Sequence, residues 1–169
     1  ARRIEKYVPA WLEDVIPWQY TEQYRQLQDA TTVPICTGED IYLKEGFLEL
    51  AKNHAVDLLH PDLATSGGIL ETHKIGDMIG EYGVGMVMHF AGSPVSCMAN
   101  VHCAAATENF MVLENHSVDV PWWSDLVEGV EKPIVNKGFV TVPDKPGLGV
   151  TLNDAVMKQH LDPADNGYF

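Results

Sequence analysis

The feature that most constrains the fold is a repeat in which short apolar segments alternate with longer segments of helical pattern. We expect strands at residues 8–14, 33–40, 55–62, 84–89 and 110–114, and helices at residues 21–30, 43–53, 67–83 and 94–108. This alternation predicts βα units and a parallel sheet. The apolar character of the strands agrees, because the strands of a parallel sheet are buried on both faces. The predicted fold class is therefore α/β.

Each expected strand ends in an acidic or basic side chain, about 25 residues after the one before it. These residues are Glu13, Glu39, Asp62, His89 and Glu114. One βα unit of a (β/α)8 barrel takes about 30 residues, and the carboxyl ends of its strands form the catalytic face. The repeat therefore predicts a partial barrel with chemically active groups at one end of its sheet.

Side-chain alternation is expected to direct these groups into the mouth of the barrel. Ile35, Thr37 and Glu39 should share one face of their strand, and Val87 and His89 one face of theirs. Carboxylates that converge there repel one another unless a cation lies between them. Because oxygen ligands on a rigid scaffold suit Mg²⁺, we predict that Glu39 and Glu13 bind it. The alternative for any one of them is a solvated residue at a strand end.

His89 is the candidate general base. It lies one unit after Asp62, and the two side chains can meet on adjacent strands of a barrel. A carboxylate that accepts the Nδ1 proton would fix the tautomer and leave Nε2 free to take a proton. The alternative is a structural histidine with satisfied hydrogen bonds. His60, which shares a strand face with Asp62, is the other candidate base.

The sequence also predicts a helix cap, the buried side of one helix and the division of the chain into two parts. Thr21 is expected to cap its helix, and the isoleucines of the helix at residues 67–83 should lie on one side, namely Ile69, Ile75 and Ile79. After Glu114 the repeat stops. We therefore divide the chain into a partial barrel at residues 1–114 and a loop-rich segment with a tail at residues 115–169.

The charge and cysteine content exclude several classes of function. The net charge of −13 repels phosphate backbones, so nucleic-acid binding is not expected. No apolar run approaches the roughly 20 residues of a membrane span, and the first residues do not form a signal peptide. The 3 cysteines contain no CxxC pair, which argues against a zinc knuckle or a disulfide framework. A reducing cytoplasm fits this pattern.

The chain resembles the enolase superfamily, and within it the mandelate racemase subgroup. The resemblance rests on WLED at residues 11–14, VPICTGED at 33–40, HPDLATSGGI at 60–69, the strands ending at His89 and Glu114, and GFVTVPDKPGLGV at 138–150. It implies strands four to eight of the barrel, with a tail that returns to a capping domain. Val15 stands where many family members have proline, which is a detail of the loop after Glu13.

The resemblance also implies residue roles. Glu13 and Glu39 would be the second and third Mg²⁺ ligands, and His89 with Asp62 would be the acid/base dyad. Glu114 would hydrogen-bond the substrate carboxylate. The first Mg²⁺ ligand, an Asp, a second acid/base and the capping domain are expected outside this chain, because the resemblance maps it to strands four to eight. The first residues, ARRIEKY, resemble the end of a helix.

The activity that the resemblance implies is that of a Mg²⁺-dependent acid-sugar dehydratase. Such a lyase abstracts the proton α to the carboxylate of a sugar acid and eliminates water, which gives a 2-keto-3-deoxy acid. The same residues also serve racemases and cycloisomerases, so both stay open. A further alternative is a half-barrel that is not catalytic by itself. A homo-oligomer of the intact chain is expected from the family.

Overall fold

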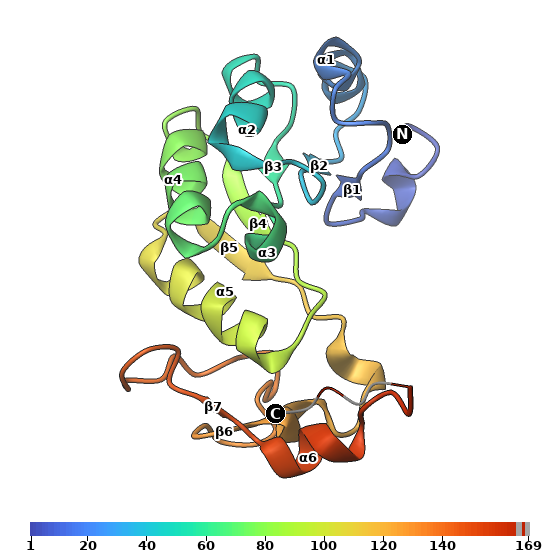
Figure 1. Cartoon of the computed structure of the whole chain (residues 1–169). Helices are drawn as coiled ribbons and strands as arrows, with labels where there is room; N and C mark the ends of the chain where they lie inside the picture. Colours follow the sequence, from blue (N-terminus) through green and yellow to red (C-terminus); the bar gives the residue numbers. More distant parts are fainter. Residues whose placement is uncertain (165–166, 168–169) are drawn as a thin grey trace.

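The computed structural model describes residues 1–164 and 167, with only the backbone of residue 118. Five parallel strands form one sheet in the order β1–β2–β3–β4–β5 (Figure 1). Their bounds are Leu12–Glu13, Ile35–Thr37, Leu58–Leu59, Gly85–Met88 and Phe110–Leu113. The predicted parallel α/β fold is confirmed. The regular strands are shorter than predicted, and all but β1 end before the strand-end side chain, although Asp62 and His89 still pair in an isolated bridge beyond β3 and β4.

A helix follows each of the first four strands. The bounds are α1 Thr21–Asp29, α2 Leu43–Lys52, α3 Leu63–Ser66, α4 Ile69–Gly80 and α5 Pro94–Ala106. Helices α2, α4 and α5 lie side by side along one face of the sheet (Figure 1). Between them and the strands lies the largest cluster of buried residues, which includes Phe47, Leu59, Ile75, Ile79 and Met86. The helices therefore cover the outer face of the sheet.

The opposite face of the sheet carries a small cluster of its own. Cys36, Leu58 and Val87 are buried there, and Trp11 packs against them. Ile35 instead packs in the large cluster under the helices. The prediction that Ile35 and Glu39 share the inner face by alternation is therefore wrong. Cys36 occupies that face of β2.

Some local predictions also differ from the structure. Thr21 is the first residue of α1 and not its cap, because Tyr20 holds the N-cap position. Ile75 and Ile79 are fully buried, but Ile69 is 43% exposed at the start of α4. The short helix α3 was not predicted, because only one turn separates Asp62 from the glycines that end it.

The C-terminal segment contains little regular structure, as expected. Its elements are the 3₁₀ helices Ser117–Asp119 and Trp123–Leu126, the antiparallel strands β6 Val127–Glu128 and β7 Thr151–Leu152, and α6 Asp154–Gln159. The short extended segment expected near residue 138 forms only the isolated bridge Asn136–Phe139. At the other end of the chain, a third 3₁₀ helix, Glu5–Tyr7, lies where the end of a helix was expected.

A short helix, α6, precedes the last residues of the chain. The side chain of Asn153 caps α6 by accepting a hydrogen bond from the backbone N–H of Val156. Residues 165–166 and 168–169 of the tail lie outside the described residues. No helix in the described part of the chain is both long and apolar enough to cross a membrane.

Gly76 lets α4 pack closely on the segment after α5. A Cβ at this position would lie 2.3 Å from Thr107 Cγ2, whereas a Cβ at Gly80 would come no closer than 3.4 Å to Asn109. We expect Gly76→Ala to lower the free energy of unfolding by about 1–3 kcal/mol, the usual cost of overpacking. Urea unfolding measures this. Gly80→Ala is the control on the same helix, and equal stabilities of the two variants would contradict the packing account.

Candidate active site

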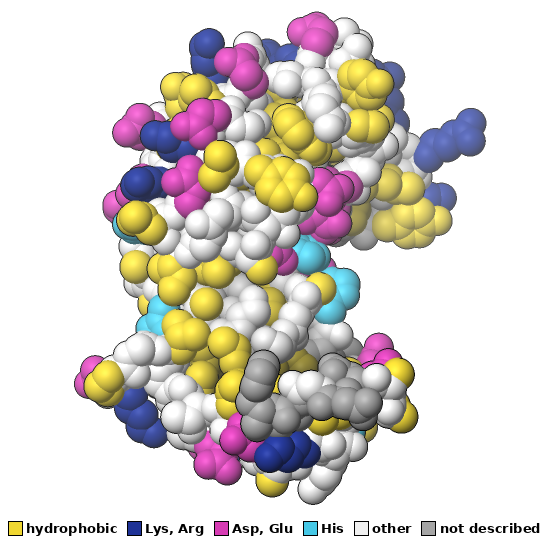
Figure 2. Space-filling view, viewed as in Figure 1, with side chains coloured by type: hydrophobic (Ala, Val, Ile, Leu, Met, Phe, Trp, Pro, Cys, Tyr) yellow, Lys and Arg dark blue, Asp and Glu magenta, His cyan; other side chains and the backbone are white. Residues whose placement is uncertain are grey.

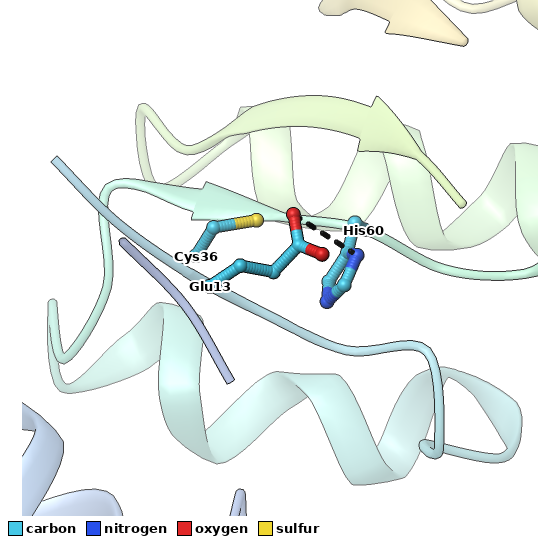
Figure 3. Close-up of side chains that lie close together, drawn as sticks. All are labelled: Glu13, Cys36 and His60. Carbon is cyan, nitrogen blue, oxygen red and sulfur yellow. Dashed lines mark ion pairs between the residues drawn. The ribbon is translucent and has the colours of Figure 1, made fainter. Parts of the chain in front are cut away.

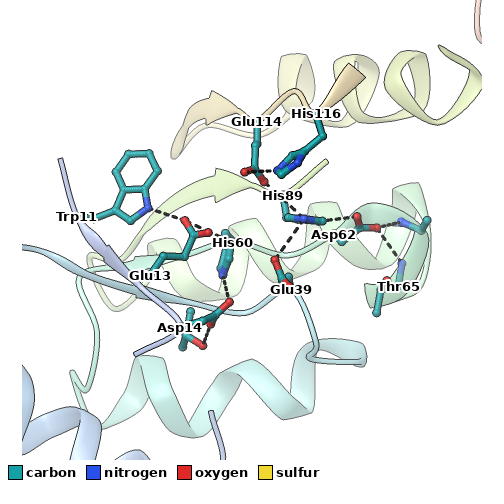
Figure 4. Close-up of polar contacts among 12 residues, drawn as sticks. Trp11, Glu13, Asp14, Glu39, His60, Asp62, Thr65, His89, Glu114 and His116 are labelled. Atoms are coloured by element: carbon teal, nitrogen blue, oxygen red, sulfur yellow. Dashed lines mark hydrogen bonds and ion pairs between the residues drawn. The ribbon is translucent and has the colours of Figure 1, made fainter. Parts of the chain in front are cut away.

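The polar side chains that end the five strands gather at one edge of the sheet. Figure 4 shows Glu13, Glu39, Asp62, His89 and Glu114 directed toward a common region. They come together because all five strands are parallel, so their carboxyl ends meet at the same edge. In the space-filling view, acidic side chains and histidines lie next to each other at the indentation on the right (Figure 2). The predicted convergence is therefore present.

Asp62 and His89 form a hydrogen-bonded pair. Strand β3 pairs with β4 in a register that sets Leu58 opposite Gly85, and the backbones of Asp62 and His89 pair four residues further on. The Nδ1 atom of His89 lies 2.8 Å from Asp62 Oδ2. The expected meeting of these two side chains follows directly from this register.

Asp62 is itself held by the first turn of α3. It occupies the N-cap position, where Oδ1 accepts hydrogen bonds from the backbone N–H groups of Ala64 at 2.7 Å and Thr65 at 3.1 Å. One oxygen therefore caps the helix and the other contacts His89. This arrangement fixes the carboxylate and, through it, the orientation of the imidazole ring.

The Nε2 atom of His89 faces two carboxylates. It lies 3.2 Å from Glu39 Oε2 and 3.5 Å from Glu114 Oε2. Glu114 reaches this position through an irregularity in β5, where Met86 pairs with Phe110 but Val87 pairs with Val112. The extra residue of this bulge turns Glu114 onto the same side as His89. The side chain of His89 is 15% exposed, so Nε2 is the accessible end of a largely buried ring.

A second group, of possible metal ligands, consists of Glu13, Asp14, Glu39 and His60. Each of the four offers a ligand atom, and these atoms all lie within 4.8 Å of one another. Alternation along a strand would direct Asp14 away from Glu13. Asp14 instead has φ 44°, a left-handed conformation that turns the chain at the strand end and brings both carboxylates together. Sequence analysis missed Asp14 for this reason.

Glu39 enters the group through an unusual backbone conformation at Gly38. Gly38 has φ 145°, and a Cβ there would lie 3.1 Å from both His60 N and Phe47 Cε1. Only glycine combines this φ with so close an approach of neighbouring chain. The turn at Gly38 brings Glu39 toward His89 although regular alternation would have directed it away.

His60 lies buried beneath these carboxylates. Its side chain is 2% exposed, with Nε2 3.2 Å from Asp14 Oδ2 and Nδ1 3.9 Å from Glu13 Oε2. Burial acts to lower the pKa of His60, but contact with Asp14 and the charges of Glu13 and Glu39 outweigh it and raise the pKa. Burial acts to raise the pKa of Asp14, but its contacts with His60 and Thr37 lower it. The two residues therefore favour an ion pair.

Two further side chains orient the acidic residues. Trp11 Nε1 donates a hydrogen bond of 2.6 Å to Glu13 Oε2, and Thr37 Oγ1 donates one of 2.5 Å to Asp14 Oδ1. Trp11 carries no charge and ends no strand, so the sequence contained no signal for its role. Thr37 was expected on the same strand face as Glu39, but its contact with Asp14 was not predicted. Both contacts of Glu13 use Oε2, which leaves Oε1 for another ligand, whereas Asp14 Oδ2 already lies against His60.

The composition of the second group fits a hard divalent cation. Carboxylate oxygens from Glu13, Asp14 and Glu39 predominate, and oxygen donors are those that Mg²⁺ prefers. Cys36 also lies near Glu13 and His60 (Figure 3). Burial, and then the charges of Glu13 and Asp14, raise the pKa of the Cys36 thiol far above its usual value. Because the thiolate is the form that binds metals and Mg²⁺ prefers oxygen donors, we do not assign Cys36 as a ligand.

A third group brings His116 to the same edge. His116 Nε2 lies 2.6 Å from Glu114 Oε1, and the rings of His116 and His89 have centroids 5.8 Å apart. Sequence analysis did not identify His116, although its position two residues after Glu114 is consistent with the same face of an extended chain.

The fold and the side chains at the strand ends define the class of protein. It is part of a parallel α/β barrel, with carboxylates and histidines at the carboxyl ends of its strands. The sequence model of the family described as Enolase C-terminal domain-like matches residues 1–156, and the chain belongs to this family. A solved mandelate racemase/muconate lactonizing enzyme-like protein from Rubrobacter xylanophilus has a TM-score of 0.91 and 34% identity. The match covers 95% of this chain and 40% of that one.

Two relatives carry names that state an activity. D-xylonate dehydratase of Haloferax volcanii is 39% identical over 95% of this chain and 39% of its own length. Arabinonate dehydratase of Saccharolobus solfataricus is 32% identical over 94% of this chain and 42% of its own length. The chain therefore spans about two fifths of the length of these curated relatives.

The Asp14–His60 pair should make stability depend on pH. Because the pKa of His60 is raised, protonated His60 contributes its full stabilisation below pH 6.5, the ordinary pKa of histidine. This contribution is lost as the pH rises through the pKa of the folded state. The lowered pKa of Asp14 stabilises the fold above 3.8 and is lost as the pH falls through its folded-state pKa. In metal-free buffer, we therefore expect the free energy of unfolding of Asp14→Asn to lie furthest below that of the wild type between pH 3.8 and pH 6.5. The difference should be smaller at pH 9.

The control for this measurement is Asp40→Asn, which changes an exposed carboxylate next to the same site. Urea unfolding at several pH values compares each variant with the wild type. A stability deficit of Asp14→Asn that stays constant from pH 5 to pH 9 would contradict the ion pair.

Proposed function

We propose that this chain supplies the C-terminal part of the active site of a Mg²⁺-dependent dehydratase that acts on a sugar acid. The reaction removes the proton α to the carboxylate and eliminates the 3-hydroxyl as water, which yields a 2-keto-3-deoxy acid. The observation that carries the proposal is the position of His89, hydrogen-bonded to Asp62 at Nδ1 with Nε2 beside two carboxylates. The names of the dehydratase relatives support the choice of dehydration.

His89 acts as the base in this proposal. With Asp62 accepting the Nδ1 proton, the lone pair lies on Nε2, the atom that lies beside Glu39 and Glu114. A correctly placed general base contributes about 10²–10⁴-fold to the rate. The proton that Nε2 removes from C2 is available for the departing 3-hydroxyl, so the overall elimination releases water without a net gain of protons by the protein.

Glu13 and Glu39 would hold the Mg²⁺ ion, with Asp14 close enough to assist. The bound ion would stabilise the negative charge that develops on the substrate carboxylate when the α proton leaves. Trp11 keeps the Glu13 carboxylate in place by its hydrogen bond. Nε2 of His89 lies 3.2 Å from Glu39 Oε2, so the base is next to a proposed metal ligand, and the substrate carboxylate and its α carbon would lie close to both.

Glu114 would contact the substrate from the other side of His89. A small cavity next to Glu114 is lined by the residues Trp11, Glu13, His60, Val87, Met88, Val112 and Glu114. The negative charge around it would repel an acidic substrate in the absence of a cation, which is why the proposal requires the metal. A hydrogen bond from a protonated Glu114 to the substrate carboxylate would orient it.

The proposal is tested by incubating the complete protein that carries this chain with Mg²⁺ and a panel of sugar acids. We expect a 2-keto-3-deoxy acid from at least one of them, and a loss of about 10³-fold or more for His89→Asn, because no base remains at Nε2. Semicarbazide detection of the keto acid measures this.

His54→Asn is the matched control, since His54 is an exposed histidine with φ 47°, a conformation that asparagine adopts readily. It should keep wild-type activity. Epimerised or rearranged acids without any keto acid would reject dehydration in favour of racemisation or cycloisomerisation. Full activity of His89→Asn would reject the assignment of the base.

A further inference from the structure

His116 is a histidine at the edge of the site that the proposed reaction does not use. It follows β5 by three residues, and its Nε2 lies 2.6 Å from Glu114 Oε1 (Figure 4). This distance is at the short end of the range for a hydrogen bond between nitrogen and oxygen. The side chain of His116 is 57% exposed, whereas that of His89 is 15% exposed.

The two oxygens of Glu114 consequently have different surroundings. Oε1 contacts His116, and Oε2 lies 3.5 Å from His89 Nε2. The backbone of Glu114 is fixed separately, because its N–H donates to the carbonyl oxygen of Met88 at 2.9 Å. The side chain has rotatable bonds beyond that anchor, and among the described residues His116 makes the hydrogen bond that restrains them.

His116 is in turn held by its neighbours. The Asn115 side chain accepts a hydrogen bond of 3.1 Å from the backbone N–H of Ser117, which closes a turn around His116. The ring of His116 is tilted by 49° against the ring of His89. The turn therefore places the imidazole at the end of β5, where its Nε2 contacts Oε1 of the carboxyl group.

We propose that His116 is a positioning residue that donates its Nε2 proton to Glu114 Oε1 and thereby directs Oε2 toward the atoms that react beside His89. The inference rests on the proposed function, in which Glu114 contacts the substrate. Orientation of a group next to the reacting centre affects the rate strongly, because a misplaced group must be ordered during the reaction. What Glu114 needs from this position is a hydrogen-bond donor, and the amide nitrogen of glutamine can take the place of Nε2.

The test compares kcat and KM of the complete protein with Mg²⁺ for His116→Ala, His116→Gln, Glu114→Gln and the double variant Glu114→Gln/His116→Ala. We expect His116→Ala to lower kcat about 10- to 100-fold, with KM changed less than about threefold. His116→Gln should recover to within about fivefold of the wild type. On the Glu114→Gln background, His116→Ala should have less than about a twofold further effect, because its partner is already altered.

Two results in this set would overturn the proposal. One is a His116→Gln variant as slow as His116→Ala, which would mean that donation of a hydrogen bond is not sufficient. The other is a full additional loss when His116→Ala is combined with Glu114→Gln, which would mean that His116 acts independently of Glu114. Circular dichroism of each variant identifies any that have lost the fold, and the glutamine variants then decide.

A spectroscopic measurement separates this inference from the proposed function. In protein labelled with ¹⁵N-histidine, the His116→Gln spectrum identifies the His116 signals. We expect the wild-type ring to carry its proton on Nε2 and this signal to shift in Glu114→Gln. If no sugar acid is dehydrated, the proposed function fails but this contact is still judged by the spectrum. A ring with its proton on Nδ1 only, or a signal unchanged by Glu114→Gln, would overturn the positioning role.

Discussion

The parallel register between β3 and β4 is the constraint on which the site depends. It sets Leu58 opposite Gly85, and four residues later it sets Asp62 opposite His89, so that the carboxylate and the imidazole meet. A shift of one residue would direct one of the two side chains to the opposite face of the sheet. The buried residues on both faces prevent such a shift, because Leu59 and Met86 pack under the helices while Leu58 and Val87 pack on the inner face.

The site concentrates negative charge, and the structure offsets it in two ways. Histidines alternate with the carboxylates: His60 lies against Asp14, His89 against Asp62, and His116 against Glu114. Neutral donors such as Trp11 engage further oxygens. The carboxylates of Glu13, Asp14 and Glu39 nevertheless lie within one small region, where their mutual repulsion favours binding of a cation. This accounts for acidic residues at strand ends in a sheet whose interior is apolar.

Much of the fold followed from patterns in the sequence. Apolar strands alternating with amphipathic helices predicted the parallel sheet, and the recurring polar residue predicted which edge of it carries the polar groups. The prediction failed where the backbone departs from regular alternation. Positive φ at Asp14 and Gly38 and the bulge in β5 each change the direction of a side chain, and none of them is visible in a hydrophobic pattern. His116 and Trp11 were missed because their importance lies in a contact with another side chain.

We propose as the central claim that the carboxylates at the ends of β1 and β2 bind the metal, while the histidine–carboxylate pair beside them acts as the general acid/base. Anomalous diffraction from crystals of the complete protein soaked in Mn²⁺, an oxygen-preferring substitute for Mg²⁺, tests it most directly. We predict one strong peak between the carboxylates of Glu13 and Glu39. A peak at the group formed by His89, Glu114 and His116, or no peak beside Glu13 and Glu39, would contradict the account.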